Sequence, residues 1–152
     1  MNIVIIGGTR GIGKEIAILM SGSASNKVLV AGRNRNSLIE LVKTSRLGNV
    51  YSAWVDLSDF DTHMIQFRDE VLSHFKAIDI LINIAGALRV RDFMKTSDDD
   101  ARLMMETNFF GPAAAIRLLT PWMKEGSHIV NISSMGGFQG SSKYRVLSYY
   151  SA

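Results

Sequence analysis

The chain alternates between short apolar runs and longer stretches in which apolar residues recur at helical spacing. The short runs are rich in β-branched residues and predict strands over Ile3 to Ile6, Lys27 to Ala31, Val50 to Val55, Ile78 to Ile82 and Ser127 to Ile132. The stretches between them predict helices over Gly11 to Met20, Asn34 to Ser45, Asp59 to Phe75 and about Asp98 to Lys124. Gly111 and Pro112 lie inside the last stretch, and we expect them to kink or interrupt it because proline has no backbone donor.

The order of these elements predicts the fold class. Strands that alternate with helices pair in parallel through right-handed crossovers. We therefore expect an α/β fold, a Rossmann-type doubly wound parallel sheet with helices on both faces. The uninterrupted apolar run from Ile3 to Ile6 agrees with a strand that is buried on both faces. The chain has no repeat, linker or low-complexity tract, which predicts a single domain over residues 1–152.

Composition and charge exclude several classes of function. The chain has no cysteine, so a disulfide framework and a thiolate metal site are both excluded, and this agrees with a reducing cytoplasm. Its three histidines form no spaced cluster, and we predict no metal. No segment resembles a signal peptide or a membrane span. The net charge of +3 is spread along the chain, which argues against nucleic acid but suits a protein that captures a phosphate-rich cofactor.

A glycine-rich loop follows the first predicted strand and opens into a helix. In Gly7-Gly8-Thr9-Arg10-Gly11-Ile12-Gly13, the first glycine would allow a sharp turn and Gly11 a close approach to a pyrophosphate. Gly13 would let the helix pack closely on the sheet, and the helix amino terminus would offer N–H groups to phosphates. The alternative is a glycine-rich turn that binds no ligand.

The GxxxGxG spacing at this position resembles the short-chain dehydrogenase/reductase family, and further family motifs follow in order. Asn83-Ile84-Ala85-Gly86 is similar to the family's NNAG motif, and Asp56-Leu57 lies where the family places an adenine contact. Asn108 and Ser134 match the family's asparagine and serine. The resemblance spans essentially the whole sequence. It implies an oxidoreductase that transfers a hydride between a nicotinamide cofactor and a carbonyl or alcohol substrate, and a homo-oligomer.

The resemblance also implies which residues form the sites. The implied catalytic residues are Asn108, Ser134 and Tyr150, with the tyrosine as the acid and the serine as the hydrogen-bond partner of the carbonyl. The implied cofactor-binding residues are Gly7, Thr9, Arg10, Gly11, Ile12, Gly13, Arg33, Asp56, Leu57, Asn83, Ala85 and Gly86. Asn108 as an ordinary surface residue and Ser134 as a turn residue remain alternatives.

The end of the second strand indicates which nicotinamide cofactor is used. An NAD site of this type has a carboxylate there, and this chain instead continues Gly32-Arg33-Asn34-Arg35. Arg33, together with Arg10 in the glycine loop, suits a 2′-phosphate, which predicts NADP. The alternative is that both arginines are solvated surface residues.

The carboxyl-terminal segment resembles the start of a further family motif. Tyr150-Ser151-Ala152 is similar to the opening of YxxxK, whose lysine would fall two residues beyond Ala152. We therefore expect a carboxyl-terminally incomplete domain without the family's last strands. Tyr144 and Tyr149 are weaker candidates for the acid, and Lys143 is a weak candidate for the cation. Two hypotheses remain, an enzyme whose longer form is active and a truncated, inactive dinucleotide-binding or subunit-pairing module.

Overall fold

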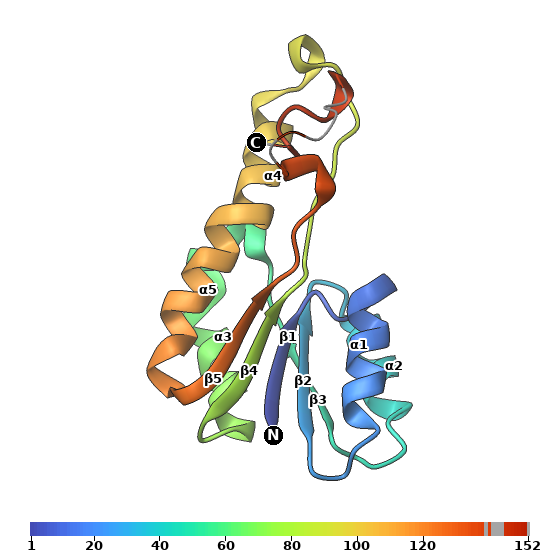
Figure 1. Ribbon diagram of the computed structural model, residues 1–152, viewed down its shortest axis with the longest axis vertical. Helices are drawn as coiled ribbons and strands as arrows, with labels where there is room; N and C mark the ends of the chain where they lie inside the picture. The colour runs from blue at the N-terminus through green and yellow to red at the C-terminus, as the bar shows by residue number, and fades with distance from the viewer. Residues whose placement is uncertain (139, 141–144, 152) are drawn as a thin grey trace.

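A five-stranded parallel sheet forms the centre of the molecule (Figure 1). The computed structural model describes residues 1–138, 140 and 145–151. The strands are β1 (Asn2–Ile6), β2 (Lys27–Gly32), β3 (Val50–Trp54), β4 (Ile78–Asn83) and β5 (Met123–Asn131). They lie in the order β3-β2-β1-β4-β5, and every neighbouring pair is parallel. The predicted doubly wound parallel sheet is therefore confirmed.

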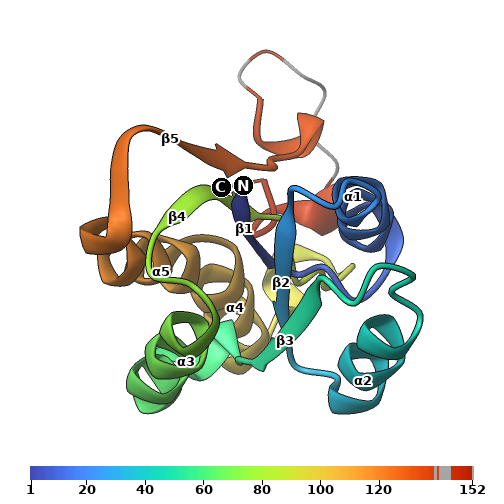
Figure 2. The same ribbon diagram turned by 90° about the horizontal axis from the view of Figure 1, so that it is seen from below.

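Helices cover both faces of this sheet, as Figure 2 shows. One face carries α1 (Gly11–Ser21) and α2 (Arg35–Lys43), and the other carries α3 (Phe60–His74), α4 (Asp98–Met105) and α5 (Gly111–Leu119). A π-helical turn, Glu106–Phe110, joins α4 to α5. Short 3₁₀ turns occupy Leu57–Asp59, Phe93–Lys95, Thr120–Trp122, Met135–Gly137 and Arg145–Leu147.

The strand β1 supplies both hydrophobic cores. Its side chains alternate between the faces, so Val4 and Ile6 join the core under α3 and α5, and Ile3 and Ile5 join the core under α1 and α2. All four are essentially inaccessible to solvent. This two-sided burial explains why the strand is apolar at every position.

The helical stretch predicted over residues 98 to 124 differs from the structure. The π turn interrupts it, and it ends before Met123, so the prediction of helix at Met123 and Lys124 was wrong. Gly111 permits the interruption, because a Cβ there would lie 2.6 Å from the carbonyl oxygen of Leu57. At the other end, Pro121 lies in the 3₁₀ turn Thr120–Trp122, and β5 starts two residues later with an irregular register against β4.

The described residues include neither a helix that could span a membrane nor a cluster of metal-binding side chains. No helix in residues 1–138, 140 and 145–151 is both long enough and apolar enough to cross a bilayer. Over the same residues, no group of three or more histidine, aspartate or glutamate side chains could hold a metal ion.

Candidate active site

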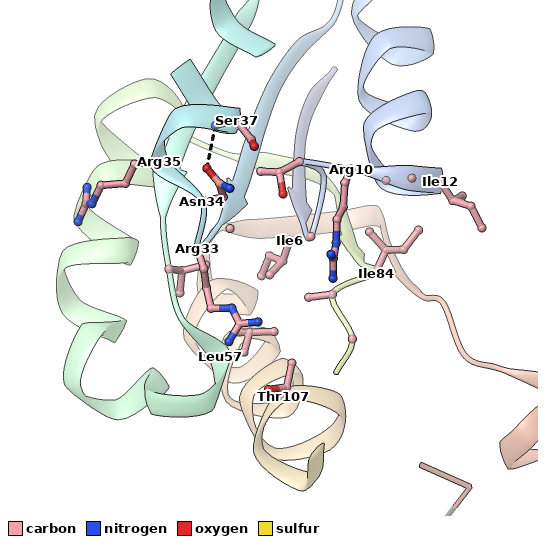
Figure 3. A pocket seen from close by; sticks show the side chains of 18 of the residues that line it. Ile6, Arg10, Ile12, Arg33, Asn34, Arg35, Ser37, Leu57, Ile84 and Thr107 are labelled. Atoms are coloured by element: carbon pink, nitrogen blue, oxygen red, sulfur yellow. Dashed lines mark hydrogen bonds between the residues drawn. The ribbon is translucent and has the colours of Figure 1, made fainter. Parts of the chain in front are cut away.

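A cavity of about 950 Å³ opens at the carboxyl ends of the central strands (Figure 3). Parallel sheets of this topology bind ligands at this edge, where the connections diverge to opposite faces. Ten of the predicted cofactor-binding residues line it, namely Gly7, Thr9, Arg10, Gly11, Ile12, Gly13, Arg33, Leu57, Ala85 and Gly86. The tertiary structure thus brings the glycine loop, the end of β2 and the segment after β4 to one cavity.

Two glycines in the loop stand where a side chain cannot fit. Gly7 has a φ of +102°, and a Cβ there would lie 2.6 Å from Cα of Ala85. A Cβ on Gly13 would meet the carbonyl oxygen of Gly7 and lie 3.0 Å from Cγ2 of Ile84. The loop therefore packs directly against the segment after β4, and α1 begins at Gly11 with its first N–H groups beside the cavity.

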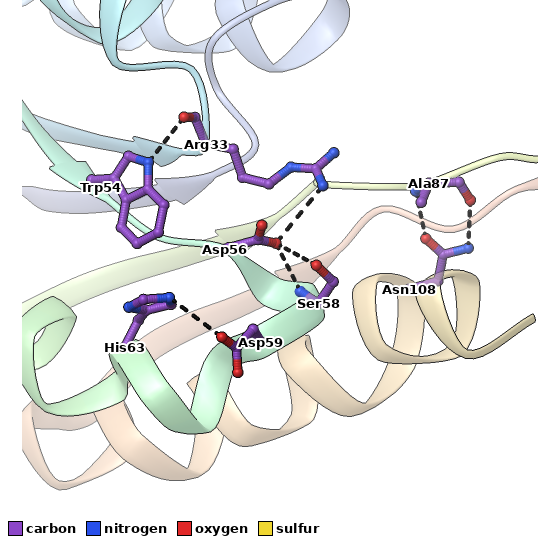
Figure 4. Close-up of polar contacts among 8 residues, drawn as sticks. All are labelled: Arg33, Trp54, Asp56, Ser58, Asp59, His63, Ala87 and Asn108. Carbon is purple, nitrogen blue, oxygen red and sulfur yellow. Dashed lines mark hydrogen bonds and ion pairs between the residues drawn. The ribbon is translucent and has the colours of Figure 1, made fainter. Parts of the chain in front are cut away.

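The two arginines singled out from the sequence both point into the cavity, as Figure 3 shows. The Arg33 guanidinium lies 3.8 Å from the Asp56 carboxylate, and the Arg33 side chain is 51% exposed. Oδ1 of Asp56 also accepts hydrogen bonds from the backbone N–H and the hydroxyl of Ser58, at 2.9 and 2.7 Å (Figure 4). Asp56 thus does not line the cavity itself but contacts Arg33, which does. Its carboxylate is fixed by the hydrogen bonds from Ser58 in the following turn. Among the described residues that line the cavity, none is acidic.

Asn83 lies within the sheet and not in the cavity wall. It is 5% exposed, and its side-chain amide donates a 2.8 Å hydrogen bond to Oδ1 of Asn131 on the neighbouring strand. This contact joins the ends of β4 and β5. The cofactor contact that the resemblance implies for Asn83 stays a prediction.

Asn108 lies in the π turn and fixes the segment after β4. Its Oδ1 accepts a hydrogen bond from the N–H of Ala87 at 2.7 Å, and its Nδ2 donates one to the carbonyl of Ala87 at 2.9 Å (Figure 4). A Cβ on Gly86 would lie 3.7 Å from Oδ1 of Asn108. Asn108 therefore stands directly behind the stretch of backbone that forms one wall of the cavity.

Ser134 and Tyr150 approach each other around Gly136. A Cβ on Gly136 would lie 3.4 Å from Oγ of Ser134 and 3.5 Å from Cδ1 of Tyr150. The Tyr150 segment also docks on the segment after β4, where the rings of Tyr149 and Phe93 stack at 5.5 Å. Neither Ser134 nor Tyr150 lines the cavity. Lys143 and Tyr144, the weaker candidates from the sequence, and Ala152 lie outside the described residues.

Several residues of the cavity wall were not predicted from the sequence. They are Ile6, Gly32, Asn34, Arg35, Asn36, Ser37, Val55, Ile84 and Thr107. One signal was available, because Asn34 caps α2 by accepting a hydrogen bond from the N–H of Ser37 at 3.0 Å, a common pattern at helix starts. Thr107 had no signal of this kind. It is 5% exposed, and its hydroxyl has no hydrogen-bond partner among the described residues.

Comparison with known proteins extends these observations. The family model for short chain dehydrogenases matches residues 1–152. The chain is 36% identical over 158 residues to dehydrogenase/reductase SDR family member 7B of Mus musculus, covering 99% of this chain and 47% of that protein. It is 28% identical over 138 residues to a 3-oxoacyl-[acyl-carrier-protein] reductase of Rattus norvegicus, covering 90% of this chain and 57% of that protein. The chain thus spans about half the length of the curated relatives it matches.

Solved structures show the same fold. Serine dehydrogenase from Escherichia coli superposes with a TM-score of 0.84 at 30% identity, covering 99% of this chain and 68% of the other. A short-chain dehydrogenase from Streptomyces avermitilis gives the same TM-score and identity, covering 99% of this chain and 54% of the other.

Proposed function

Because this chain belongs to the short-chain dehydrogenase/reductase family, we propose that its cavity binds NADPH and that it forms the coenzyme-binding part of an oxidoreductase acting on a carbonyl or alcohol substrate. The coenzyme would supply or accept the hydride. The protein's part is to hold the coenzyme, orient the substrate oxygen and move a proton.

The observation that carries the proposal is the charge of the cavity. Arg10 and Arg33 enter it from two separate loops, and none of its described lining residues is acidic. Guanidinium groups form charge-assisted, often bidentate hydrogen bonds with phosphate. The contact between Arg33 and Asp56 is long and half-exposed, so a dianionic 2′-phosphate would compete with it successfully.

The glycine loop fits the pyrophosphate of such a coenzyme. A Cβ on Gly11 would meet no atom within 4 Å, and Gly11 is the first residue of α1. A phosphate beside it would receive N–H hydrogen bonds and face the positive end of the helix dipole. The close packing of Gly7 on Ala85 brings this loop near the segment after β4, so one extended ligand can contact both.

The catalytic roles are part of the same proposal. Tyr150 would donate a proton to the substrate oxygen, and Ser134 would hydrogen-bond that oxygen. The proximity of both to Gly136 supports a shared site. Asn108 would act by holding the backbone of Ala87, as its two hydrogen bonds indicate.

The names of the matched relatives, which are dehydrogenases and reductases, favour an enzyme over an inactive module. Self-association and a cytoplasmic location stay predictions.

Coenzyme binding tests the proposal directly. We expect NADPH to bind about tenfold more tightly than NADH in a fluorescence titration, because a charged hydrogen bond to the 2′-phosphate contributes about 1.5 to 3 kcal/mol. Arg33→Asp should erase or reverse this preference. Arg46→Asp makes the same charge change at an exposed position away from the cavity and should preserve it. Equal affinities of the unmodified chain for the two coenzymes would overturn the NADPH assignment.

Turnover tests the catalytic part. In a form extended past Ala152 through the lysine of the motif, assayed with NADPH and a panel of ketones, Tyr150→Phe should lower the rate of NADPH oxidation by about 10² or more, since general acid catalysis is lost. Ser134→Ala should also lower it. An unchanged rate in Tyr150→Phe would assign the proton transfer to another group.

A further inference from the structure

Trp54 lies at the end of β3, directly beside the point where β2 enters the cavity. The register of the sheet pairs Trp54 with Gly32, the residue before Arg33. From this position the indole N–H donates a 2.9 Å hydrogen bond to the carbonyl oxygen of Arg33 (Figure 4). The backbone of a residue whose side chain points into the cavity is thus fixed by a neighbouring strand.

The same indole ring also contacts Arg35. The Cζ atom of Arg35 lies 4.7 Å from the ring centroid, within the range of a cation–π interaction. Figure 3 shows the Arg35 side chain directed away from the cavity, although the residue itself belongs to the wall. Trp54 therefore contacts a guanidinium that points away from the cavity and also bonds to the backbone of Arg33, whose guanidinium points into it.

A third contact holds the indole itself in place. The His63 ring meets the Trp54 ring edge-on, with centroids 4.6 Å apart and planes at 86°. His63 belongs to α3, and its Nε2 lies 3.6 Å from the Asp59 carboxylate. Trp54 consequently connects the loop after β2 to a helix on the opposite face of the sheet.

These contacts bear on how strongly the loop can discriminate between ligands. Arg33 and Asn34 are exposed, and an unsupported exposed loop would lose conformational entropy on binding a phosphate. An anchored backbone removes part of that cost. The lower entropy cost strengthens binding only for a ligand that contacts Arg33. Among the nicotinamide coenzymes, that ligand is the one with a 2′-phosphate.

We propose that Trp54 is a positioning residue for coenzyme selection, which orients the loop after β2 so that Arg33 meets the 2′-phosphate of the coenzyme. The inference rests on the proposed preference for NADPH. It assigns to Trp54 an effect on the ratio of the two affinities, whereas a purely structural role would change both affinities together.

The first test replaces the indole by a ring without the N–H group. In Trp54→Phe we expect the Kd for NADPH to rise about threefold to fivefold, as for loss of one neutral hydrogen bond, and the Kd for NADH to stay unchanged. Trp122→Phe is the matched control, since Trp122 lies in a 3₁₀ turn packed against the core and lines no part of the cavity. It should leave both Kd values unchanged.

The second test needs no change at Trp54. In the Trp122→Phe background Trp54 is the sole tryptophan, because the chain contains two. Adding 2′,5′-ADP should change its emission, and adding 5′-ADP, which lacks the 2′-phosphate, should not. This measurement decides the question if Trp54→Phe folds poorly.

The outcomes separate the inference from its premise. If the unmodified chain binds NADPH and NADH equally, the proposed function is overturned and the inference falls with it. If the preference is present but Trp54→Phe keeps the original ratio of Kd values, or if both ADP isomers change the emission equally, the inference alone is overturned. A selective loss of NADPH affinity together with a selective emission change supports it.

Discussion

The carboxamide of Asn108 and the backbone of Ala87 form two hydrogen bonds that run in opposite directions. The amide side chain donates and accepts at once, so the pair resembles the contact between two residues of neighbouring strands. It joins the π turn between α4 and α5 to the segment after β4. The turn and the cavity wall therefore form one unit, although the two residues are 21 positions apart in the sequence.

This pairing predicts that a negative charge at position 108 lowers the stability of the fold. Asn108→Asp keeps the acceptor for the N–H of Ala87 but turns the donor into a carboxylate oxygen that faces the Ala87 carbonyl. We expect a loss of about 1 to 3 kcal/mol in the free energy of unfolding, measured by urea denaturation. Glu106→Gln changes an exposed side chain of the same turn and should alter stability by less than about 0.5 kcal/mol. Equal effects would show that the pairing contributes nothing.

A substitution at Thr107 should change the stability in the opposite direction. Its hydroxyl is buried without a partner among the described residues, and valine has nearly the same shape without the polar group. Thr107→Val should therefore stabilise the chain by about 1 kcal/mol, which raises the melting temperature by a few degrees. Thr107→Ser keeps the hydroxyl, loses the methyl group and should destabilise. A lower melting temperature for the valine variant would indicate that the hydroxyl has a partner in solution.

The glycine loop predicts a contrast between two similar substitutions. Gly7 and Gly11 both have positive φ, but a Cβ on Gly7 would collide with the backbone of Ala85 and one on Gly11 would meet nothing within 4 Å. Gly7→Ala should thus prevent folding, seen as insoluble expression. Gly11→Ala should fold with a loss of about 1 to 2 kcal/mol from backbone strain alone. Folded, stable Gly7→Ala would mean that the loop can move away from Ala85.

The edge strand β5 predicts self-association of the 152-residue chain. β5 pairs only with β4 among the described strands, and Ile129, Val130 and the following Ile132 are exposed. An exposed apolar edge is a template for pairing with another chain. Light scattering should show mass rising with concentration, and Ile129→Lys should reduce it. Ile18→Lys, on the exposed side of α1, is the control. A monomer at all concentrations would contradict this prediction.

Local patterns in the sequence predicted most of the fold. A run of apolar residues predicted each strand. In β1, β2 and β4 such runs arise because both faces of the sheet are covered there, whereas β5 is exposed along most of its length. The glycine loop was found from spacing alone, since its place between β1 and α1 is a local property of the chain. Arg10 and Arg33 were selected for their chemistry, and the structure directs both into one cavity.

Other features depend on contacts between distant segments. Gly111, directly after the π turn, lies close against Leu57, and the side chain of Asn83 bonds to Asn131 on the neighbouring strand. Trp54 looks like an ordinary strand residue in the sequence. Its contact with Arg33 exists only because β3 lies next to β2.

The sequence by itself determined the order of the elements, the parallel doubly wound sheet and the residue types available for a phosphate-rich ligand. These follow from hydrophobic periodicity and side-chain chemistry, which act over a few residues. The tertiary structure decided which of those residues share a cavity, where the helical stretch predicted over residues 98 to 124 is interrupted, and which polar groups are paired. The physical reason is that close packing and hydrogen bonding are set by neighbours in space, and the chain brings together segments that its sequence keeps far apart.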